Sequence, residues 1–349
     1  MSIIQHLVID QYGAFLGKHS ERLIVTKGEE KIAQVPLLHL ESVVIANRGV
    51  SLSAEAVREC TERGIPIHFL SGTGTPYASL YSAGLTGTVA TRRAQLEAYN
   101  DSRGLHLALA LVIGKLQNQS NLLKYMAKYR KETDETLFKE LRLRATEVLD
   151  ELIEVDRLRQ YPEVQDGTAS VSDLRAGLMG LEGRAAQRYW GAVRLVVPEK
   201  YAFPGRTGRG AVDPLNAALN YAYGILYGQV ERCLVLAGLD PYAGFLHVDR
   251  PGKPSLTLDF IEEFRAVVVD RTILGLANKS VTLDQEEGGL LTKETRRMLA
   301  EKVTERLETA VPFEGKRHPL GAVMQMQARH VATFLRGERL TYEPFQMEW

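Results

Sequence analysis

Cysteine is scarce in this sequence, which has only Cys60 and Cys233 among its 349 residues. The two cysteines lie far apart in the chain, and neither belongs to a CxxC pair. This spacing argues against a disulfide framework and against a cysteine-ligated zinc site. We therefore expect the protein in a reducing cytoplasm.

The sequence also lacks a long apolar run and a net charge. No segment reaches the roughly 18 apolar residues that a membrane span requires, and MSIIQHLVIDQYG is unlike a signal peptide. We expect a soluble protein without a membrane partner. Basic and acidic residues number 43 each, and the pI is about 7.1. This balance argues against nucleic-acid binding over the whole surface, although it permits local basic patches.

The residues that are present divide the sequence into two parts. Up to about residue 90, short apolar runs between turn residues predict strands at HLVID, ERLIVTK, KIAQVPL, SVVIA and IPIHFL. One short helix is predicted there, capped by Ser53 and ended by Gly64. From about residue 92, helical periodicity continues almost to the end. We predict an α+β multidomain protein with a small β-rich N-terminal domain (1–91) and a larger all-helical C-terminal domain (92–349).

Two stretches are candidate nucleic-acid contacts. Residues 124–160 mix both signs of charge at helical spacing, which is typical either of a solvated helical hairpin or of a nucleic-acid surface. The contact candidates in that segment are Lys128, Arg130, Lys131, Lys139, Arg142 and Arg144. The second stretch carries Arg206 and Arg209 with no acid from Tyr201 to Val212. It is either a phosphate-binding loop or a flexible basic loop, and Asp213-Pro214 after it predicts a helix start.

An acidic pair follows a histidine in HVDRPGKPSLTLDFIEEFR, residues 247–265. With Ser255 as the predicted N-cap, Asp259 and Glu262 fall on one helical face, roughly 5–6 Å apart at Cβ, close enough to serve one cation. An acidic solvent-exposed face gives the same pattern. The turn-rich loop before the helix allows His247 to fold back toward the helix start, either as a ligand or as a structural residue.

A second carboxylate, Glu182, shares its predicted helical face with apolar residues such as Leu178 and Tyr189. An unpaired charge on an apolar stripe is costly, so Glu182 needs a partner, which is either an arginine or a bound metal. Glycine recurs every third residue in this helix, at positions 177, 180 and 183. Such a stripe predicts that something packs very close, either another helix or a nucleic-acid backbone.

Together these segments resemble the CRISPR-associated integrase family usually called Cas one. The resemblance covers essentially the whole chain, and the segments follow one another in the family's order. They are CTERGIPIHFL, RRAQ, GKLQNQ, GLEGRAAQRYW, DPLNAALNYAYGIL, GLDPYAGFLH, SLTLDFIEEFR with VVVDRTI, and QARHVATFLRGERLTYEPF.

The resemblance implies a catalytic site with Mg²⁺ or Mn²⁺ bound by Glu182, His247 and Glu262. Asp259 would have a supporting role, and Glu263 is the rival ligand, predicted to point along the same face as Glu262. The family implies an enzyme that joins the 3′ ends of a captured DNA fragment to a CRISPR repeat and that cuts DNA. It also implies a homodimer formed by the β-rich domains and bridged by a dimer of the small partner called Cas two.

A DNA enzyme with zero net charge must segregate its charges. We therefore predict that Arg206, Arg209, Lys128 and Arg142 line a DNA groove beside the metal. Two other functions fit part of the pattern. One is a non-catalytic DNA-binding scaffold with a structural acidic cluster, and the other is a small-molecule metal hydrolase, which leaves the family resemblance unexplained.

Overall fold

The computed structural model describes residues 6–72, 74, 76–82, 88–208 and 210–349, and its chain forms two compact units. One unit consists of Met1–Leu85, Gly208–Gly228 and Leu283–Glu305. The other consists of Thr86–Thr207, Gln229–Thr282 and Arg306–Trp349. Two long helices, α7 (Pro214–Leu236) and α11 (Lys293–Glu308), contribute residues to both units.

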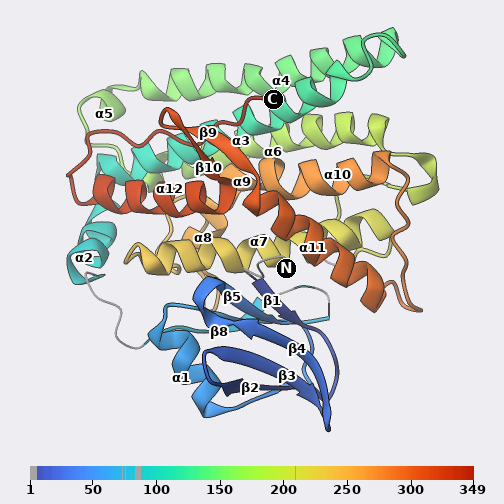
Figure 1. Cartoon of the computed structure of the whole chain (residues 1–349). Helices are drawn as coiled ribbons and strands as arrows, with labels where there is room; N and C mark the ends of the chain where they lie inside the picture. The colour runs from blue at the N-terminus through green and yellow to red at the C-terminus, as the bar shows by residue number, and fades with distance from the viewer. Residues whose placement is uncertain (1–5, 73, 75, 83–87, 209) are drawn as a thin grey trace. The chain divides into compact units, whose positions relative to one another are not determined.

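The first unit contains two four-stranded sheets, drawn in blue in Figure 1. One has the order β1-β5-β7-β8, in which β8 is antiparallel and the others are parallel. Its strands are β1 (His6–Ile9), β5 (Ser42–Ile45), β7 (Ile67–Leu70) and β8 (Pro76–Leu80). The other has the order β4-β3-β2-β6, with β4 (Glu30–Pro36), β3 (Arg22–Lys27), β2 (Phe15–His19) and β6 (Ser51–Leu52). Both sheets contribute to one core, for example through Leu16, Leu23, Val43 and Ile67.

The sequence predicts much of this unit correctly. The five predicted strands are present as β1, β3, β4, β5 and β7, whereas β2, β6 and β8 have no matching prediction. Gly28, with a φ of 59°, forms the turn between β3 and β4. The first helix, α1 (Ala54–Glu62), begins after Ser53, whose side chain accepts a hydrogen bond from the Ala56 amide at 3.1 Å. A short 3₁₀ turn, η1 (Leu37–His39), follows β4.

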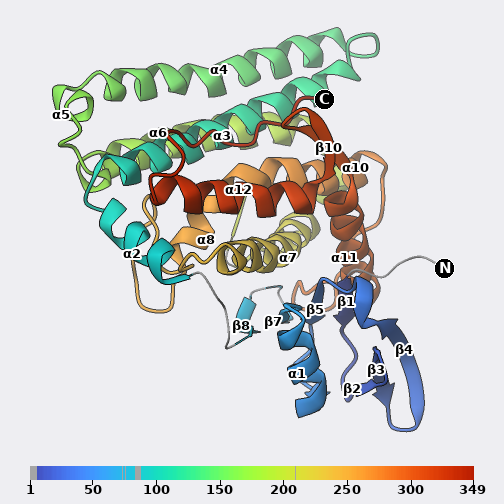
Figure 2. The same cartoon turned by 60° about the vertical axis from the view of Figure 1, so that its left-hand side comes forward.

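The second unit is helical in its described residues apart from one hairpin. Its elements are α2 (Thr88–Ala98), α3 (Ser102–Lys128), α4 (Glu135–Arg159), α5 (Pro162–Gln165), α6 (Val171–Val196), η2 (Glu199–Tyr201), α8 (Ser255–Phe260), α9 (Glu262–Phe264), η3 (Arg265–Asp270), α10 (Arg271–Asn278), β9 (Ala310–Phe313), β10 (Lys316–Pro319) and α12 (Leu320–Leu335). Figures 1 and 2 show α3, α4 and α6 packed side by side. The predicted fold class is confirmed, with a β-rich N-terminal part before a larger helical part. The domain boundary at residues 91 and 92 stays a prediction.

Helix α3 packs against several other helices of the second unit, among them α4, α6 and α9. It begins after Asp101, whose side chain accepts a hydrogen bond from the Arg103 amide at 2.9 Å. Its segment LALALV is buried on every face, as expected for a helix with neighbours on several sides. Lys115 is 9% exposed in the middle of this helix, so its charge requires partners inside the protein.

The chain after α12 runs back along α3 and is fixed there by hydrogen bonds. The Asn118 side chain donates to the carbonyl of Phe345 at 2.8 Å and accepts from the amide of Met347 at 2.8 Å. Asn121, one turn further along α3, donates to the Met347 carbonyl at 3.0 Å. These contacts hold the terminal Trp349 near the end of α3. Among the described residues, no helix is both long enough and apolar enough to cross a bilayer.

Candidate functional site

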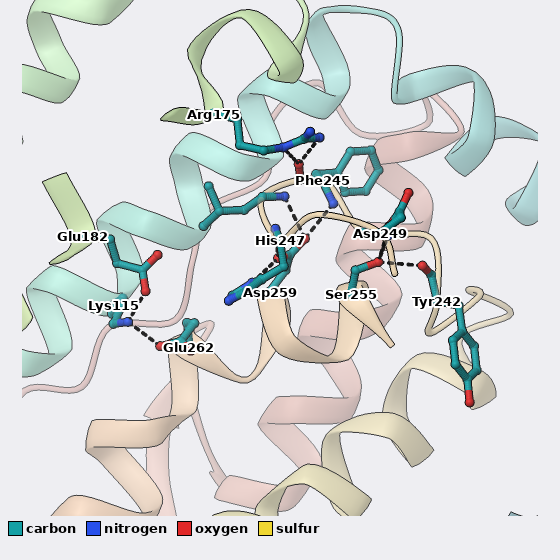
Figure 3. A network of polar contacts seen from close by, with 12 residues as sticks. Lys115, Arg175, Glu182, Tyr242, Phe245, His247, Asp249, Ser255, Asp259 and Glu262 are labelled. Carbon is teal, nitrogen blue, oxygen red and sulfur yellow. Dashed lines mark hydrogen bonds and ion pairs between the residues drawn. The ribbon is translucent and has the colours of Figure 1, made fainter. Parts of the chain in front are cut away.

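Two of the predicted ligands meet at a residue that the sequence analysis did not identify. Lys115 of α3 forms ion pairs with Glu182 of α6 and with Glu262 of α9, the latter at 2.6 Å (Figure 3). The prediction that Glu182 needs a partner is confirmed. The partner is a lysine and not the arginine that the sequence suggested, and the metal alternative stays a prediction.

The cluster is charged. Burial alone would raise the pKa of Glu262, but Arg265, at 2.8 Å, and Lys115 lower it to about 2. Burial would lower the pKa of Lys115, but the two carboxylates raise it above its ordinary value. One oxygen of the Glu182 carboxylate, Oε2, is buried without a hydrogen-bond partner. The site therefore has two carboxylates, an ammonium group between them and an unused acceptor.

His247 is held by Asp259 of α8. The buried Asp259 carboxylate accepts hydrogen bonds from the amides of Phe245, Leu246 and His247 at 2.6, 2.9 and 2.8 Å. It also accepts one from His247 Nδ1 at 2.7 Å. This network folds the loop back onto the helix start, as the sequence predicted. Because Nδ1 is used in this contact, Nε2 is the ring nitrogen left to bind a ligand.

The charge on His247 is favoured by its surroundings. Burial lowers the pKa of the imidazole, but the hydrogen bond and charge of Asp259 outweigh burial and raise it. The charges of Glu262 and Glu182 raise it further, so both carboxylates lie close enough to interact with the ring.

The loop before α8 approaches the helix very closely. A Cβ atom at Gly244 would lie 2.6 Å from the Ser255 carbonyl carbon, so only glycine fits there. Ser255 is the first helical residue and not the N-cap that the sequence predicted. Its hydroxyl contacts the Asp249 carboxylate at 2.6 Å and the Gly244 amide at 2.9 Å. On its other side, Arg175 of α6 donates to the Phe245 carbonyl at 3.0 Å (Figure 3).

Glu263 is not directed to the same partners as its neighbour Glu262. Its buried carboxylate accepts hydrogen bonds from the Tyr342 hydroxyl at 2.6 Å, the Phe345 amide at 2.7 Å and the Gln327 side chain at 3.0 Å. Burial raises its pKa to about 7 despite these donors. The expectation that Glu263 points along the same face as Glu262 is therefore wrong, because Glu263 fastens the C-terminal segment. A π-helical stretch, η3, begins at Arg265, two residues after Glu263.

Three of the four predicted DNA contacts lie in the described residues. The Arg206 guanidinium lies 5.8 Å from the Trp190 ring centre, and Arg209 lies outside the described residues. Lys128 and Arg142 line a common pocket. Lys128 is 13 residues beyond Lys115 in α3, which is about 20 Å along the helix axis. Lys128 therefore does not lie beside the acidic cluster as predicted, and the role of the predicted DNA contacts stays a prediction.

The donor set suits a hard divalent cation, with carboxylate oxygens and one imidazole nitrogen. The buried, unpaired Oε2 of Glu182 also fits a metal ligand. Within the part of the chain that the structure describes, however, no three His, Cys, Asp or Glu side chains are grouped around one metal position. The Lys115 ammonium lies between Glu182 and Glu262 instead, so the triad of Glu182, His247 and Glu262 stays a prediction.

Lys115 had a signal in the sequence. It is the lone charge in LALALVIGKLQN, where apolar residues occupy every face of the helix. The same argument that identified Glu182 applies to it, because two opposite charges on apolar helices are each other's natural partners.

Comparisons with known proteins agree with these features. The family model for CRISPR associated protein Cas1 matches residues 7–305. A CRISPR-associated endonuclease Cas1 from Archaeoglobus fulgidus is 36% identical, with 98% of this chain and 99% of that protein covered. Among solved structures, a casposase bound to integration product has a TM-score of 0.79 at 20% identity, covering 99% of this chain and 94% of that one. A chain of a Cas6-RT-Cas1–Cas2 complex has a TM-score of 0.74 at 21% identity, covering 100% of this chain and 37% of that one.

Proposed function

This chain belongs to the CRISPR associated protein Cas1 family, and from that premise we propose that it is a divalent-metal-dependent DNA integrase and endonuclease of CRISPR adaptation. It inserts captured DNA fragments at the CRISPR repeat by attack of a 3′-hydroxyl on a phosphodiester. The observation that carries the proposal is the pair of carboxylates, Glu182 and Glu262, that meet at Lys115, with His247 within their electrostatic reach.

Glu182, Glu262 and Nε2 of His247 would hold Mg²⁺ or Mn²⁺. A divalent ion held by these three residues would supply Lewis-acid stabilisation of the negative charge that develops at the scissile phosphate. The two carboxylates already share one cation, the Lys115 ammonium, which supports their use as a cation site. Lys115 keeps this pair compact, and in the complex its ammonium can contact a phosphate oxygen of the substrate instead.

Asp259 orients the imidazole. Its hydrogen bond to Nδ1 fixes the ring and leaves the lone pair of Nε2 for the ligand position, the arrangement that metal-binding histidines usually have. Its three bonds from backbone amides make that orientation rigid. Asp259 therefore acts on the reaction through His247, and it does not touch the substrate.

DNA approaches along α6 in this proposal. Positions 177, 180 and 183 are exposed glycines beside Glu182, and at 177 and 183 an added Cβ would have no described atom within 4 Å. Among the described residues no other helix covers positions 177 and 183, which supports the nucleic-acid backbone over a packed helix as the neighbour of the stripe. A helix face without side chains lets a phosphate backbone come close. The related structures named as an integration product complex and a Cas1–Cas2 complex support DNA and a dimer of Cas two as partners.

We further propose that residues 1–91 form the contact of a homodimer and that the protein works in the cytoplasm. Arg206, Arg209, Lys128 and Arg142 are proposed as DNA contacts. The competing proposal is a non-catalytic DNA-binding scaffold, in which the ion-paired cluster of Lys115, Glu182 and Glu262 has only a structural role.

Strand transfer tests the proposal. A labelled DNA fragment is offered to a repeat-containing plasmid with Mn²⁺ and the small partner protein, and the unaltered chain is compared with Glu262→Gln and His247→Ala. Both substitutions should reduce transfer by at least about a hundredfold. Glu154→Gln, which removes an exposed carboxylate on α4, is the matched control and should transfer normally.

The outcomes separate the two functions. Unchanged transfer by both Glu262→Gln and His247→Ala would show that the metal site is wrongly assigned. A lack of transfer by the unaltered chain, together with intact DNA binding, would favour the scaffold. DNA binding by all variants is measured in parallel, so that loss of fold is not mistaken for loss of chemistry.

A further inference from the structure

A basic pocket lies at the far end of α3 from Lys115. It has a volume of about 370 Å³, within the size range of small-molecule sites. Its lining comes from the end of α3, the start of α4 and the C-terminal segment: Asn121, Lys124, Tyr125, Lys128, Lys131, Phe138, Arg142, Glu348 and Trp349. Four of these side chains are cationic and one is acidic.

The cations of this pocket differ from the others on the same helices. Elsewhere on α4, Arg144, Arg157 and Arg159 each form an ion pair with an acid three or four residues away. Over the residues that the structure describes, no acid lies within ion-pair distance of the cations at positions 124, 128, 131 and 142. Lys124 and Lys128 are four residues apart on α3 and so lie on one side of it, and Lys131 lines the same pocket from the turn that follows the helix.

Aromatic rings form another part of the pocket wall. The rings of Tyr125 and Trp349 are 5.3 Å apart between centres and tilted by 40°, and Phe138 lines the pocket from α4. The Trp349 indole N–H is buried and has no acceptor in the described structure. The bonds from Asn118 and Asn121 to the segment before it hold this ring in place.

Two arginines add positive charge behind this aromatic wall. The guanidinium of Arg271, a residue of α10, lies 4.4 Å from the centre of the Tyr125 ring. Burial, together with the charge of Arg271, lowers the pKa of Arg306 to about 10. Neither arginine is paired with an acid in the described residues. Several unneutralised cations close to aromatic faces favour an anionic ligand that also has a flat ring.

We propose that this pocket binds a nucleotide of single-stranded DNA, with its base stacked on Trp349 and its phosphate held by Lys124, Lys128, Lys131 and Arg142. The inference rests on the proposed DNA function and names a second DNA-binding site, whose lining on α3 begins at Asn121, about 9 Å along the helix axis from Lys115, and reaches Lys128, about 20 Å from it. Duplex DNA is disfavoured because its bases are already stacked and paired, so that aromatic faces gain contact only with an unpaired base.

The test uses the two tryptophans, Trp190 and Trp349, as reporters. In a Trp190→Phe background the fluorescence comes from Trp349 alone, and stacking of a base should quench it. A short oligothymidine is titrated against the intact chain, with a blunt duplex, thymidine monophosphate and inorganic phosphate in parallel. We expect quenching by the single strand at concentrations at least about tenfold below those of the other three ligands.

Variants assign the two halves of the pocket. Lys128→Ala with Arg142→Ala should weaken single-strand binding about tenfold or more and reduce its salt dependence. Trp349→Leu should weaken it about tenfold, and Trp349→Phe should retain most of the affinity. Arg157→Ala with Arg159→Ala removes the same charge from the outer, ion-paired part of α4 and should bind normally. Anisotropy of a labelled oligothymidine repeats each measurement without the Trp190 substitution.

Several results would overturn the inference. Equal affinity for the duplex, or unchanged binding after the Lys128 and Arg142 substitutions, would exclude a single-strand pocket. Tighter binding of the free mononucleotide would assign the pocket to a small-molecule ligand. These binding measurements use Glu262→Gln protein without divalent cations, so they do not depend on strand transfer. The single-strand proposal for the pocket can therefore be refuted while strand transfer by the unaltered chain is observed. Equally, binding in the pocket can be observed while strand transfer is absent.

Discussion

Lys115 offers a direct test of the cation site, because replacing it by methionine keeps most of its volume but removes the charge. Its ammonium touches both Glu182 and Glu262, so the two carboxylate oxygens lie within roughly 5 Å of each other. At an effective dielectric of about 20, two like charges at such a distance repel by about 3–4 kcal/mol. Breaking a buried ion pair costs a similar amount, about 3–5 kcal/mol. Lys115→Met should therefore lose about 4 kcal/mol of unfolding free energy without metal.

A divalent cation should reverse this loss if the two carboxylates bind one. At 100 times its dissociation constant, a ligand that binds only the folded state adds about 2.7 kcal/mol to the unfolding free energy. Mn²⁺ should therefore stabilise Lys115→Met more than it stabilises the unaltered chain, because the ion no longer competes with the ammonium. The assay is urea unfolding in EDTA and in Mn²⁺, followed by circular dichroism.

The control for this experiment is Lys302→Met, on α11, which loses an exposed lysine and should change stability by less than about 0.5 kcal/mol. The reasoning is refuted if Lys115→Met is as stable as the unaltered chain in EDTA. It is also refuted if Mn²⁺ adds no more stability to the variant than to the unaltered chain.

Two further predictions concern the glycine face of α6 and the aspartate that holds His247. At Gly180 an added Cβ would meet only an Arg184 nitrogen, at 3.8 Å, so Gly180→Ala should raise the unfolding free energy by up to about 1 kcal/mol. Gly180→Gln should also be at least as stable as the unaltered protein, but it should reduce strand transfer several-fold. Normal strand transfer by Gly180→Gln would mean that DNA does not pack on this face of α6. Asp259→Asn should cost about 3 kcal/mol, because its amide group must face backbone N–H donors. This cost should be larger below pH 6.5 than at pH 8, because the raised pKa of His247 contributes stability at low pH that is lost as pH rises through that pKa. An equal cost at both pH values in urea unfolding would show that Asp259 does not favour the charged imidazole.

Local signals in the sequence account for many elements of the fold. Ser53 before an apolar-periodic run and Asp213 before Pro214 both begin helices where predicted, since capping depends on residues within one turn. At Ser255 the predicted N-cap is wrong by one residue, because Ser255 is the first residue of the helix. Its hydroxyl hydrogen-bonds to Tyr242 and Asp249 of the preceding loop instead of capping the helix. A tertiary contact there competes with the local cap.

The sequence by itself determined the family, the order of a β-rich part before a helical part, and the need of Glu182 for a charged partner. The family follows from the resemblance of the quoted motifs. The other two conclusions follow from helical and strand periodicity, which fixes which side chains share a face and needs only neighbouring residues. Only the tertiary structure decided that the partner is Lys115, 67 residues earlier, and that Glu263 turns to the C-terminal segment. It also brought Trp349 beside Lys128 and Arg142. Periodicity carries no information about which helices pack together, because that depends on side-chain fit and charge pairing between segments far apart in the chain.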